Sequence, residues 1–255
     1  MSTTPFNLEG RVAWVTGGSK GLGRTFAETL ADAGARVALC SRDEAEAQAA
    51  AREIQVRSGM NCLGSHGDVA SSADVRRMAA EIEAELGPID ILVANAGINI
   101  RAETEQLSEV DWDAVVNVNL KGAFLCAKAA LPGMRRRGWG RIVFMGSIMS
   151  FISLPARAAY ASSKAALLGL TRTLALESAR DGVCVNALCP GPFKTPMNVT
   201  LTQNEDKRRA MLDRIPMGRW GEPDELRGLL LCLCSDAASF MTGSAVVADG
   251  GWTAQ

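Results

Sequence analysis

Two residue types that carry much of enzyme chemistry are almost missing from this sequence of 255 residues. It contains one histidine, His66, and one tyrosine, Tyr160. A zinc site built from several histidines is therefore excluded, as is a relay of two histidines, and we expect no metal. A Ser-His-Asp mechanism would have to use His66. Any role that needs a phenol falls on Tyr160.

The sequence also lacks an excess of either charge and any long apolar run. Its 27 Lys and Arg residues nearly balance 28 Asp and Glu residues, which argues against nucleic acid or an anionic membrane as the main partner. No apolar run approaches the roughly 20 residues that a membrane-spanning helix needs. Residues 1–10 are polar and lack the pattern of a signal peptide. We therefore expect a cytoplasmic protein that acts on a small molecule.

The seven cysteines form no CxxC pair. Most of them lie in apolar runs such as 229–234, where a free cysteine usually behaves as a small buried hydrophobic residue. We therefore expect neither a metal-binding nor a disulfide framework.

Short apolar runs alternate with longer amphipathic or alanine-rich segments along the chain. The apolar runs are too continuous to leave one face in water, which predicts parallel strands covered on both sides, at 12–16, 37–40, 89–94, 142–145, 183–188 and 245–248. Helices are expected between them, at 22–33, 44–58, 73–86, 111–137, 158–180 and 224–234. This order predicts an α/β fold with a Rossmann-type, doubly wound parallel sheet of about seven strands. We see no linker or repeat, so we predict one domain over 1–255.

One segment, 190–216, breaks this alternation. It is long, polar and rich in proline, a composition that is wrong for a strand. Long loops in compact domains are often active-site lids, so we predict a substrate lid here.

A glycine-rich turn, Thr16–Gly23, follows the first strand and opens a helix. Glycines there let the backbone turn tightly and let a pyrophosphate approach the helix N-terminus, where free N–H groups favour anions. Two other motifs overlap this turn. An esterase nucleophile elbow around Ser19 needs a histidine late in the chain, and His66 comes far too early. A P-loop needs a lysine where Arg24 stands.

The glycine spacing reads TGxxxGxG rather than GxGxxG, and it resembles the short-chain dehydrogenase/reductase family. The resemblance runs from end to end as an ordered series, although Ala94 stands where the family usually has asparagine. The series continues with Asn95-Ala96-Gly97, Asn119, Ser147, the pattern Tyr160-x-x-x-Lys164, and Pro190-Gly191 followed by Thr195. The resemblance implies oxidoreductase activity with a nicotinamide cofactor.

Tyr160 and Lys164 are four residues apart on a predicted helix, so their side chains lie on one face. Reduction of a carbonyl needs a proton for the developing alkoxide, and an unperturbed tyrosine, with a pKa of about 10, exchanges protons poorly near neutrality. Lowering this pKa by roughly 3 units requires about 4 kcal/mol, and the Lys164 ammonium together with the positive nicotinamide ring of the oxidised cofactor has the right sign to supply it. The resemblance implies that Ser147 hydrogen-bonds the carbonyl oxygen, that Lys164 also holds the nicotinamide ribose, and that Asn119 anchors a water relay.

The residues after the second strand bear on the choice of cofactor. An acidic residue there would repel a 2'-phosphate, but the sequence reads Cys40-Ser41-Arg42. Arg42 and Lys20 resemble the NADP-preferring members of the family, so we expect NADP(H) rather than NAD(H). Asp68-Val69, after the third strand, resembles the pair that contacts adenine. The complete set of expected cofactor contacts is Gly17, Ser19, Lys20, Gly21, Leu22, Gly23, Ser41, Arg42, Asp68, Val69, Asn95, Ala96, Gly97, Tyr160, Lys164, Pro190, Gly191 and Thr195.

Substrate contacts are expected from 99–102, from 148–154 and from the lid. We predict that Arg101, Ser147, Met149 and Tyr160 bind the substrate, with Arg101 pairing a carboxylate. The segments 97–101, 218–222 and 249–252 most resemble sugar-acid dehydrogenases of the gluconate 5-dehydrogenase kind. We therefore expect a secondary alcohol/ketone pair on a polyol or sugar acid.

Three other functions remain open. The β-ketoacyl thioester reductases, which act on carrier-protein substrates, share much of this pattern. A non-catalytic dinucleotide sensor is disfavoured because Tyr160 and Lys164 are retained, and a hydrolase using Ser19 is disfavoured by the missing late histidine. The family commonly forms tetramers, and the apolar stretches 123–131 and 165–176 allow a homo-oligomer here.

Overall fold

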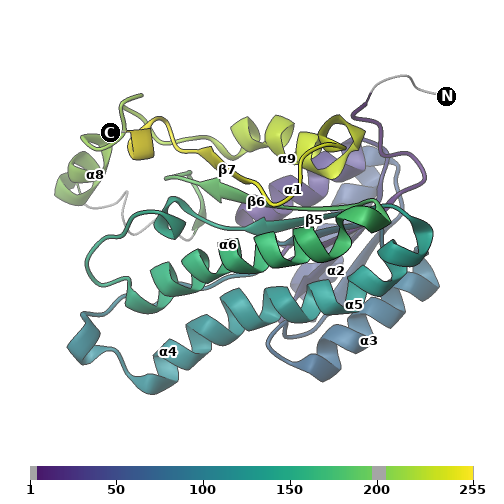
Figure 1. Cartoon of the computed structure of the whole chain (residues 1–255), viewed down its shortest axis with the longest axis horizontal. Coiled ribbons are helices and arrows are strands. Elements are labelled where there is room, and N and C mark those ends of the chain that lie inside the picture. The colour runs from purple at the N-terminus through teal and green to yellow at the C-terminus, as the bar shows by residue number, and fades with distance from the viewer. Residues whose placement is uncertain (1–4, 197–204, 255) are drawn as a thin grey trace.

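The computed structural model describes residues 5–196 and 205–254, and it contains a seven-stranded parallel sheet in the order β3-β2-β1-β4-β5-β6-β7. Helices cover both faces of this sheet (Figure 1). The predicted doubly wound α/β fold is confirmed. Because the strand order reverses between β1 and β4, a crevice is expected outside the carboxyl ends of these two strands.

The strands match the predicted apolar runs, with one addition at the sheet edge. They are β1 (Val12–Thr16), β2 (Arg36–Ser41), β3 (Cys62–His66), β4 (Ile91–Ala94), β5 (Gly140–Met145), β6 (Val183–Pro190) and β7 (Ala245–Ala248). The apolar pattern gives no bounds for β3, because this edge strand contains no apolar run and Ser65 is the one residue in it that is fully buried.

The helices connect these strands in chain order. The longer ones are α1 (Gly21–Asp32), α2 (Glu44–Ser58), α3 (Ser72–Glu85), α4 (Glu109–Val116), α5 (Gly122–Arg137), α6 (Ala158–Ser178), α8 (Glu205–Leu212) and α9 (Arg227–Cys234). Short 3-10 turns lie at Thr104–Gln106, Ile148–Ser150, Ala179–Asp181, Pro223–Leu226, Asp236–Ala238 and Trp252–Ala254, and a π-helical stretch at Asn117–Lys121.

The core has two halves, one on each face of the sheet. Trp14 points into the half that α3, α5 and α6 cover, while Val15, the next residue of β1, points into the half under α1, α2 and α9. Adjacent strand residues face opposite sides. Both halves are apolar, which explains why the strands read as continuous apolar runs.

The segment Glu109–Arg137 is long and apolar enough to cross a membrane, by length and composition alone. In the structure it is α4, the π-helical stretch and α5 in succession. Ala127, Ala130 and Met134 on α5 are fully buried in the half of the core that contacts the sheet. The segment therefore packs as a core helix.

The predicted lid, 190–216, lies partly outside the described residues, which omit 197–204. Phe193 forms a bridge with Gly221 at its start, and α8 follows the gap. Met211 of α8 lines the cavity described below, which places part of this segment over the crevice.

Candidate active site

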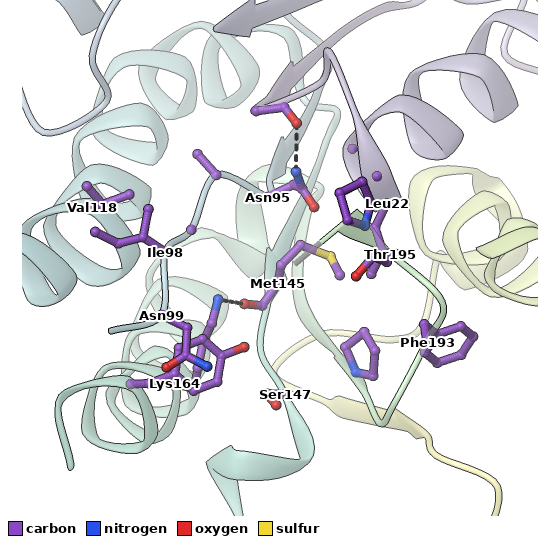
Figure 2. A pocket seen from close by; sticks show the side chains of 18 of the residues that line it. Leu22, Asn95, Ile98, Asn99, Val118, Met145, Ser147, Lys164, Phe193 and Thr195 are labelled. Atoms are coloured by element: carbon purple, nitrogen blue, oxygen red, sulfur yellow. Dashed lines mark hydrogen bonds between the residues drawn. The ribbon is translucent and has the colours of Figure 1, made fainter. Parts of the chain in front are cut away.

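A cavity of about 670 Å³ opens at the carboxyl edge of the sheet. Side chains from the loop after β4, from β5, from α6 and from the glycine-rich turn converge on it (Figure 2). All the predicted cofactor residues line this cavity, as do the four residues predicted individually to bind the substrate, Arg101, Ser147, Met149 and Tyr160. Of the predicted ranges 99–102 and 148–154, the residues that line it are Asn99, Arg101, Ile148, Met149 and Leu154. Of the four residues predicted to be catalytic, Ser147, Tyr160 and Lys164 line it, whereas Asn119 lies behind its wall.

The glycine-rich turn is shaped to receive an anion. Gly17 and Gly21 adopt left-handed backbone conformations with φ of 62° and 56°, which side-chain-bearing residues rarely adopt. A Cβ on Gly23 would lie 2.1 Å from the Gly17 carbonyl oxygen. The N-cap of α1, Lys20, makes no side-chain capping bond. The first N–H groups of α1 are therefore available to a pyrophosphate, as the glycine pattern predicts.

The end of the cavity beside Arg42 and Lys20 carries positive charge. Arg42 lines it, and the Lys20 ammonium lies 3.2 Å from Glu46. Asp43 does not oppose these cations at the cavity, because its carboxylate accepts a hydrogen bond from the N–H of Glu46 and caps α2. Two cations, Arg42 and the Glu46-paired Lys20, therefore line this end of the cavity.

Asn95 joins the two strands that flank the crevice. Its side-chain amide donates to the carbonyl oxygens of Thr16 and Gly17, at 3.0 and 3.1 Å. The Thr16 hydroxyl in turn accepts from the N–H of Ala96. These bonds fix the glycine-rich turn against the end of β4.

Asn119 is buried in the π-helical stretch, and both ends of its amide are used. Its oxygen accepts from the N–H of Ile98, and its nitrogen donates to the Ile98 carbonyl and to the Ser163 hydroxyl. The side chain therefore ties the loop after β4 to α6. The water relay expected of Asn119 is a separate role, which these hydrogen bonds do not test and which stays a prediction.

Tyr160, Lys164 and Ser147 lie together at the middle of the cavity. The Lys164 ammonium donates to the Met145 carbonyl at 2.6 Å (Figure 2) and lies 5.7 Å from the centre of the Tyr160 ring. Burial lowers the pKa of Lys164 to about 8. Figure 2 shows Ser147 at the end of β5, facing the same space as Lys164.

The phenol of Tyr160 has a raised pKa in the protein without a cofactor. Burial raises the pKa of Tyr160, while a hydrogen bond with Ser147 and the charge of Arg157 lower it and only partly offset burial. The expected decrease of the phenol pKa by Lys164 is therefore not a property of the protein alone. The protein holds the phenol protonated, the form that can donate a proton.

Two polar residues of the cavity wall carry no motif in the sequence. Arg157, the N-cap of α6, lies three residues before Tyr160. Asn99 has a buried side-chain oxygen with no hydrogen-bond partner among the described residues. His66, at the end of β3, is exposed and does not line the cavity. The one feature of the sequence that could have identified Arg157 as a residue of the site is its position about one helical turn before Tyr160.

Comparison with known proteins gives consistent matches over nearly the whole chain. A family model described as enoyl-(acyl carrier protein) reductase matches residues 17–253. A 3-oxoacyl-(acyl-carrier-protein) reductase of Aquifex aeolicus is 37% identical over 96% of this chain and 98% of that protein. A gluconate 5-dehydrogenase of Gluconobacter oxydans is 38% identical over 97% of this chain and 96% of that protein.

Solved structures agree with these matches. The crystal structure of a gluconate 5-dehydrogenase of Burkholderia cenocepacia, in complex with NADP and tartrate, is similar with a TM-score of 0.95. It is 39% identical and covers 98% of each chain.

Proposed function

The chain belongs to the short-chain dehydrogenase/reductase family, and from this premise we propose that it uses NADP(H) to interconvert a secondary alcohol and a ketone on a polyol or sugar acid. The observation that carries the proposal is the joint position of Ser147, Tyr160 and Lys164 in one cavity with the glycine-rich turn. Membership in the family makes the protein an oxidoreductase, and the alcohol/ketone chemistry follows from the three side chains.

The residues of the site divide the chemistry between them. A nicotinamide cofactor in this cavity supplies or accepts the hydride. Ser147 donates a hydrogen bond to the carbonyl oxygen, and Tyr160 delivers the proton that this oxygen needs as it becomes an alkoxide. Lys164 places a positive charge 5.7 Å from the phenol ring, which stabilises the phenolate left behind. A second role proposed for its ammonium, on the resemblance to the family, is to hold the ribose of the bound cofactor.

The preference for NADP(H) rests on charge at the far end of the cavity. Arg42 follows β2, where an acidic residue would repel a 2'-phosphate, and no carboxylate among the described residues is paired with it. Asp43 is occupied as a helix cap. The Burkholderia cenocepacia relative was crystallised with NADP, which supports the same choice.

A sugar acid or related hydroxy acid is the substrate class that these features favour. Arg101 lines the cavity and makes no ion pair within the described part of the chain, so its guanidinium is available to a carboxylate. The relative that was crystallised with tartrate is a gluconate 5-dehydrogenase. A sugar acid would give Arg101 a partner and present hydroxyl groups to Ser147 and Tyr160.

The second candidate is reduction of a 3-oxoacyl thioester. It is supported by the similarity to the Aquifex aeolicus reductase and by apolar side chains of the cavity wall, Met149, Leu154 and Met211, which would suit an acyl chain. An acyl thioester offers no carboxylate to Arg101, so the two candidates differ in the need for this cation.

The direct test follows NADPH oxidation with a panel of keto sugar acids, neutral ketones and 3-oxoacyl thioesters, and NADP reduction with the matching alcohols. Turnover with the sugar acids supports the first candidate, and turnover only with the thioesters supports the second. Tyr160→Phe should lose at least about 100-fold in kcat while it still binds NADPH. A protein that turns over no alcohol or ketone with either cofactor would contradict both.

We also propose that the protein is a cytoplasmic homo-oligomer. Leu176 on α6 is 84% exposed and Phe124 on α5 is 41% exposed, and between these helices lies a hollow lined in part by Leu131 and Leu174. Exposed apolar surface of this kind suits a subunit interface. Sedimentation should show a dimer or tetramer that Leu176→Asp dissociates, whereas a monomeric wild-type protein would contradict the proposal.

A further inference from the structure

The wall of the cavity carries more positive charge than the cofactor and the proton transfer use. Among the described residues that line the cavity, Asp68 is the single carboxylate. The cations that line it are Lys20, Arg42, Arg101, Arg157 and Lys164. Lys20 and Arg42 lie at the end that suits the phosphates, and Lys164 contacts the end of β5. Arg101 and Arg157 have neither role, although both line the cavity and the charge of Arg157 acts on Tyr160.

Arg101 and Arg157 come from different elements but act on one another. Arg101 follows the loop after β4, and Arg157 immediately precedes α6. The positive charge of Arg101 lowers the pKa of Arg157, in addition to the larger effect of burial. Two like charges in one partly enclosed space repel each other, and an anion bound between them offsets this repulsion.

The donors of Arg157 are largely unused. A guanidinium has five N–H donors, and the hydrogen bond of Arg157 within the described residues runs to the carbonyl oxygen of its neighbour Ala156 at 3.0 Å. Neither Arg101 nor Arg157 forms an ion pair with a carboxylate in the part of the chain that the structure describes. Their free donors are therefore available to a ligand.

Backbone strain accompanies this arrangement. Ala156 has φ of 59°, and in the described residues it is the single non-glycine residue with positive φ. Such a conformation is strained for a residue with a side chain and tends to occur where function requires it. It lies directly before Arg157, so it sets the direction in which the chain enters α6.

Asn99 adds a third feature to the same wall. Its side-chain oxygen is buried and has no partner among the described residues, and a buried acceptor of this kind favours a ligand that donates a hydrogen bond. Asn99 lines the cavity two residues before Arg101, so the acceptor and the two guanidinium groups belong to one region of the cavity.

We propose that Arg157 is a specificity-determining residue, which together with Arg101 binds the carboxylate of a hydroxy-acid substrate while Asn99 accepts a hydrogen bond from one of its hydroxyl groups. This proposal rests on the proposed function and sharpens it. The two guanidinium groups select an acid over the neutral polyol of the same length. The single arginine that sequence reasoning identified becomes one of a pair.

The test uses the protein loaded with NADPH, in which D-gluconate is an alcohol and cannot turn over. Calorimetry compares D-gluconate with D-gluconamide, which has the same hydroxyl groups and no charge. The wild-type protein should bind gluconate at least about 10-fold more tightly than the amide, and Arg157→Ala should lose about 10- to 100-fold for gluconate alone. Arg157→Lys should retain part of the affinity because it keeps the charge.

Arg172→Ala is the matched control, since Arg172 is an exposed arginine on α6 that does not line the cavity, and it should bind gluconate as the wild type does. Unchanged NADPH affinity shows that each variant is folded. The proposal is overturned if gluconate does not bind, if it binds no better than the amide, or if Arg157→Ala leaves its affinity unchanged. Gluconate binding through Arg157 without oxidation of any alcohol would instead overturn the proposed function alone.

Discussion

The Lys164 ammonium lies 5.7 Å from the centre of the Tyr160 ring, one turn further along α6, and donates to the Met145 carbonyl at the end of β5. One bond therefore fixes the catalytic face of α6 against the end of β5, two residues before Ser147. The phenol stays protonated in the protein alone, because burial outweighs the hydrogen bond from Ser147 and the charge of Arg157. The remaining stabilisation of a phenolate has to come from bound ligands and from Lys164.

Arg42 is expected to set the cofactor preference. Loss of a charge-assisted contact to the 2'-phosphate costs roughly 1.5–3 kcal/mol, so Arg42→Ala should lower kcat/KM for NADPH by about 10- to 100-fold and change kcat/KM for NADH little. Steady-state kinetics with both cofactors measures this. Arg52→Ala is the control, because Arg52 is an exposed arginine on α2 outside the cavity. A wild-type protein that prefers NADH would make this interpretation of Arg42 wrong.

Gly23→Ala is expected to abolish cofactor binding. The added Cβ would lie 2.1 Å from the Gly17 carbonyl oxygen and 2.5 Å from the Asn95 amide nitrogen, so the glycine-rich turn would have to move away from β4. Titration of protein fluorescence with NADPH should show at least about a 100-fold loss of affinity, which corresponds to roughly 2.8 kcal/mol.

Gly228→Ala provides the comparison for this substitution. Gly228 lies in α9, is exposed and has nothing within 4 Å of an added Cβ. Alanine there should stabilise the fold by about 0.5–1 kcal/mol, because alanine loses less backbone entropy in a helix. Equal NADPH affinity in both variants would show that the close approach of Gly23 to Gly17 does not matter for binding.

The sequence predicts most of this site because the residues concerned follow strands whose apolar runs are easy to recognise. Gly17, Asn95 and Ser147 each come at or shortly after the end of a buried strand, and parallel strands bring these ends to one edge. Arg157 could not be predicted in this way. It precedes a helix rather than following a strand, and the residue before it, Ala156, has the left-handed φ of 59° that no local sequence pattern predicts.

The polar partners of Asn119 were also beyond sequence reasoning. Its contacts with Ile98 and Ser163 depend on a π-helical stretch between α4 and α5, which the apolar pattern of a single long helix does not reveal. The bounds of the edge strand β3, which was expected before Asp68, could not be predicted for a related reason, because a strand with few fully buried side chains lacks an apolar run. The local pattern of apolar residues predicts buried strands and helices well, and it predicts exposed strands and irregular helices poorly.

Lys164 is expected to make stability depend on pH. Its pKa falls from 10.5 in the unfolded chain to about 8 in the folded protein, so between these values the unfolded state binds more protons and stability from this group rises with pH. Below pH 8 the buried charge costs roughly 3 kcal/mol. Lys164→Met should therefore be more stable than the wild type at pH 8, and this advantage should shrink by about 1.5 kcal/mol at pH 9.5.

Denaturant unfolding of both proteins at the two pH values measures the effect. Subtracting the free energy of unfolding of one protein from that of the other removes most of the contribution of the buried thiols. Staying below pH 10 limits the ionisation of Tyr160 in the unfolded chain. Cys189 and Tyr160 are the titratable neighbours of Lys164 in these measurements. A stability difference that does not change between pH 8 and pH 9.5 would mean that Lys164 keeps its ordinary pKa.

Tyr160 is the single tyrosine of the chain, so the ultraviolet absorbance of phenolate reports on this site alone. Burial raises its pKa above 10.0, and the ionisation midpoint of the folded protein should lie above that of the denatured protein. Removing the positive charge in Arg157→Ala favours the neutral phenol, so the midpoint should rise further, while Arg157→Lys should stay near the wild type.

Loading with NADP should move the midpoint down, because the oxidised nicotinamide ring is positive. Circular dichroism at each pH shows that the protein is still folded, and a midpoint that falls in Arg157→Ala would mean that its guanidinium does not act on the phenol.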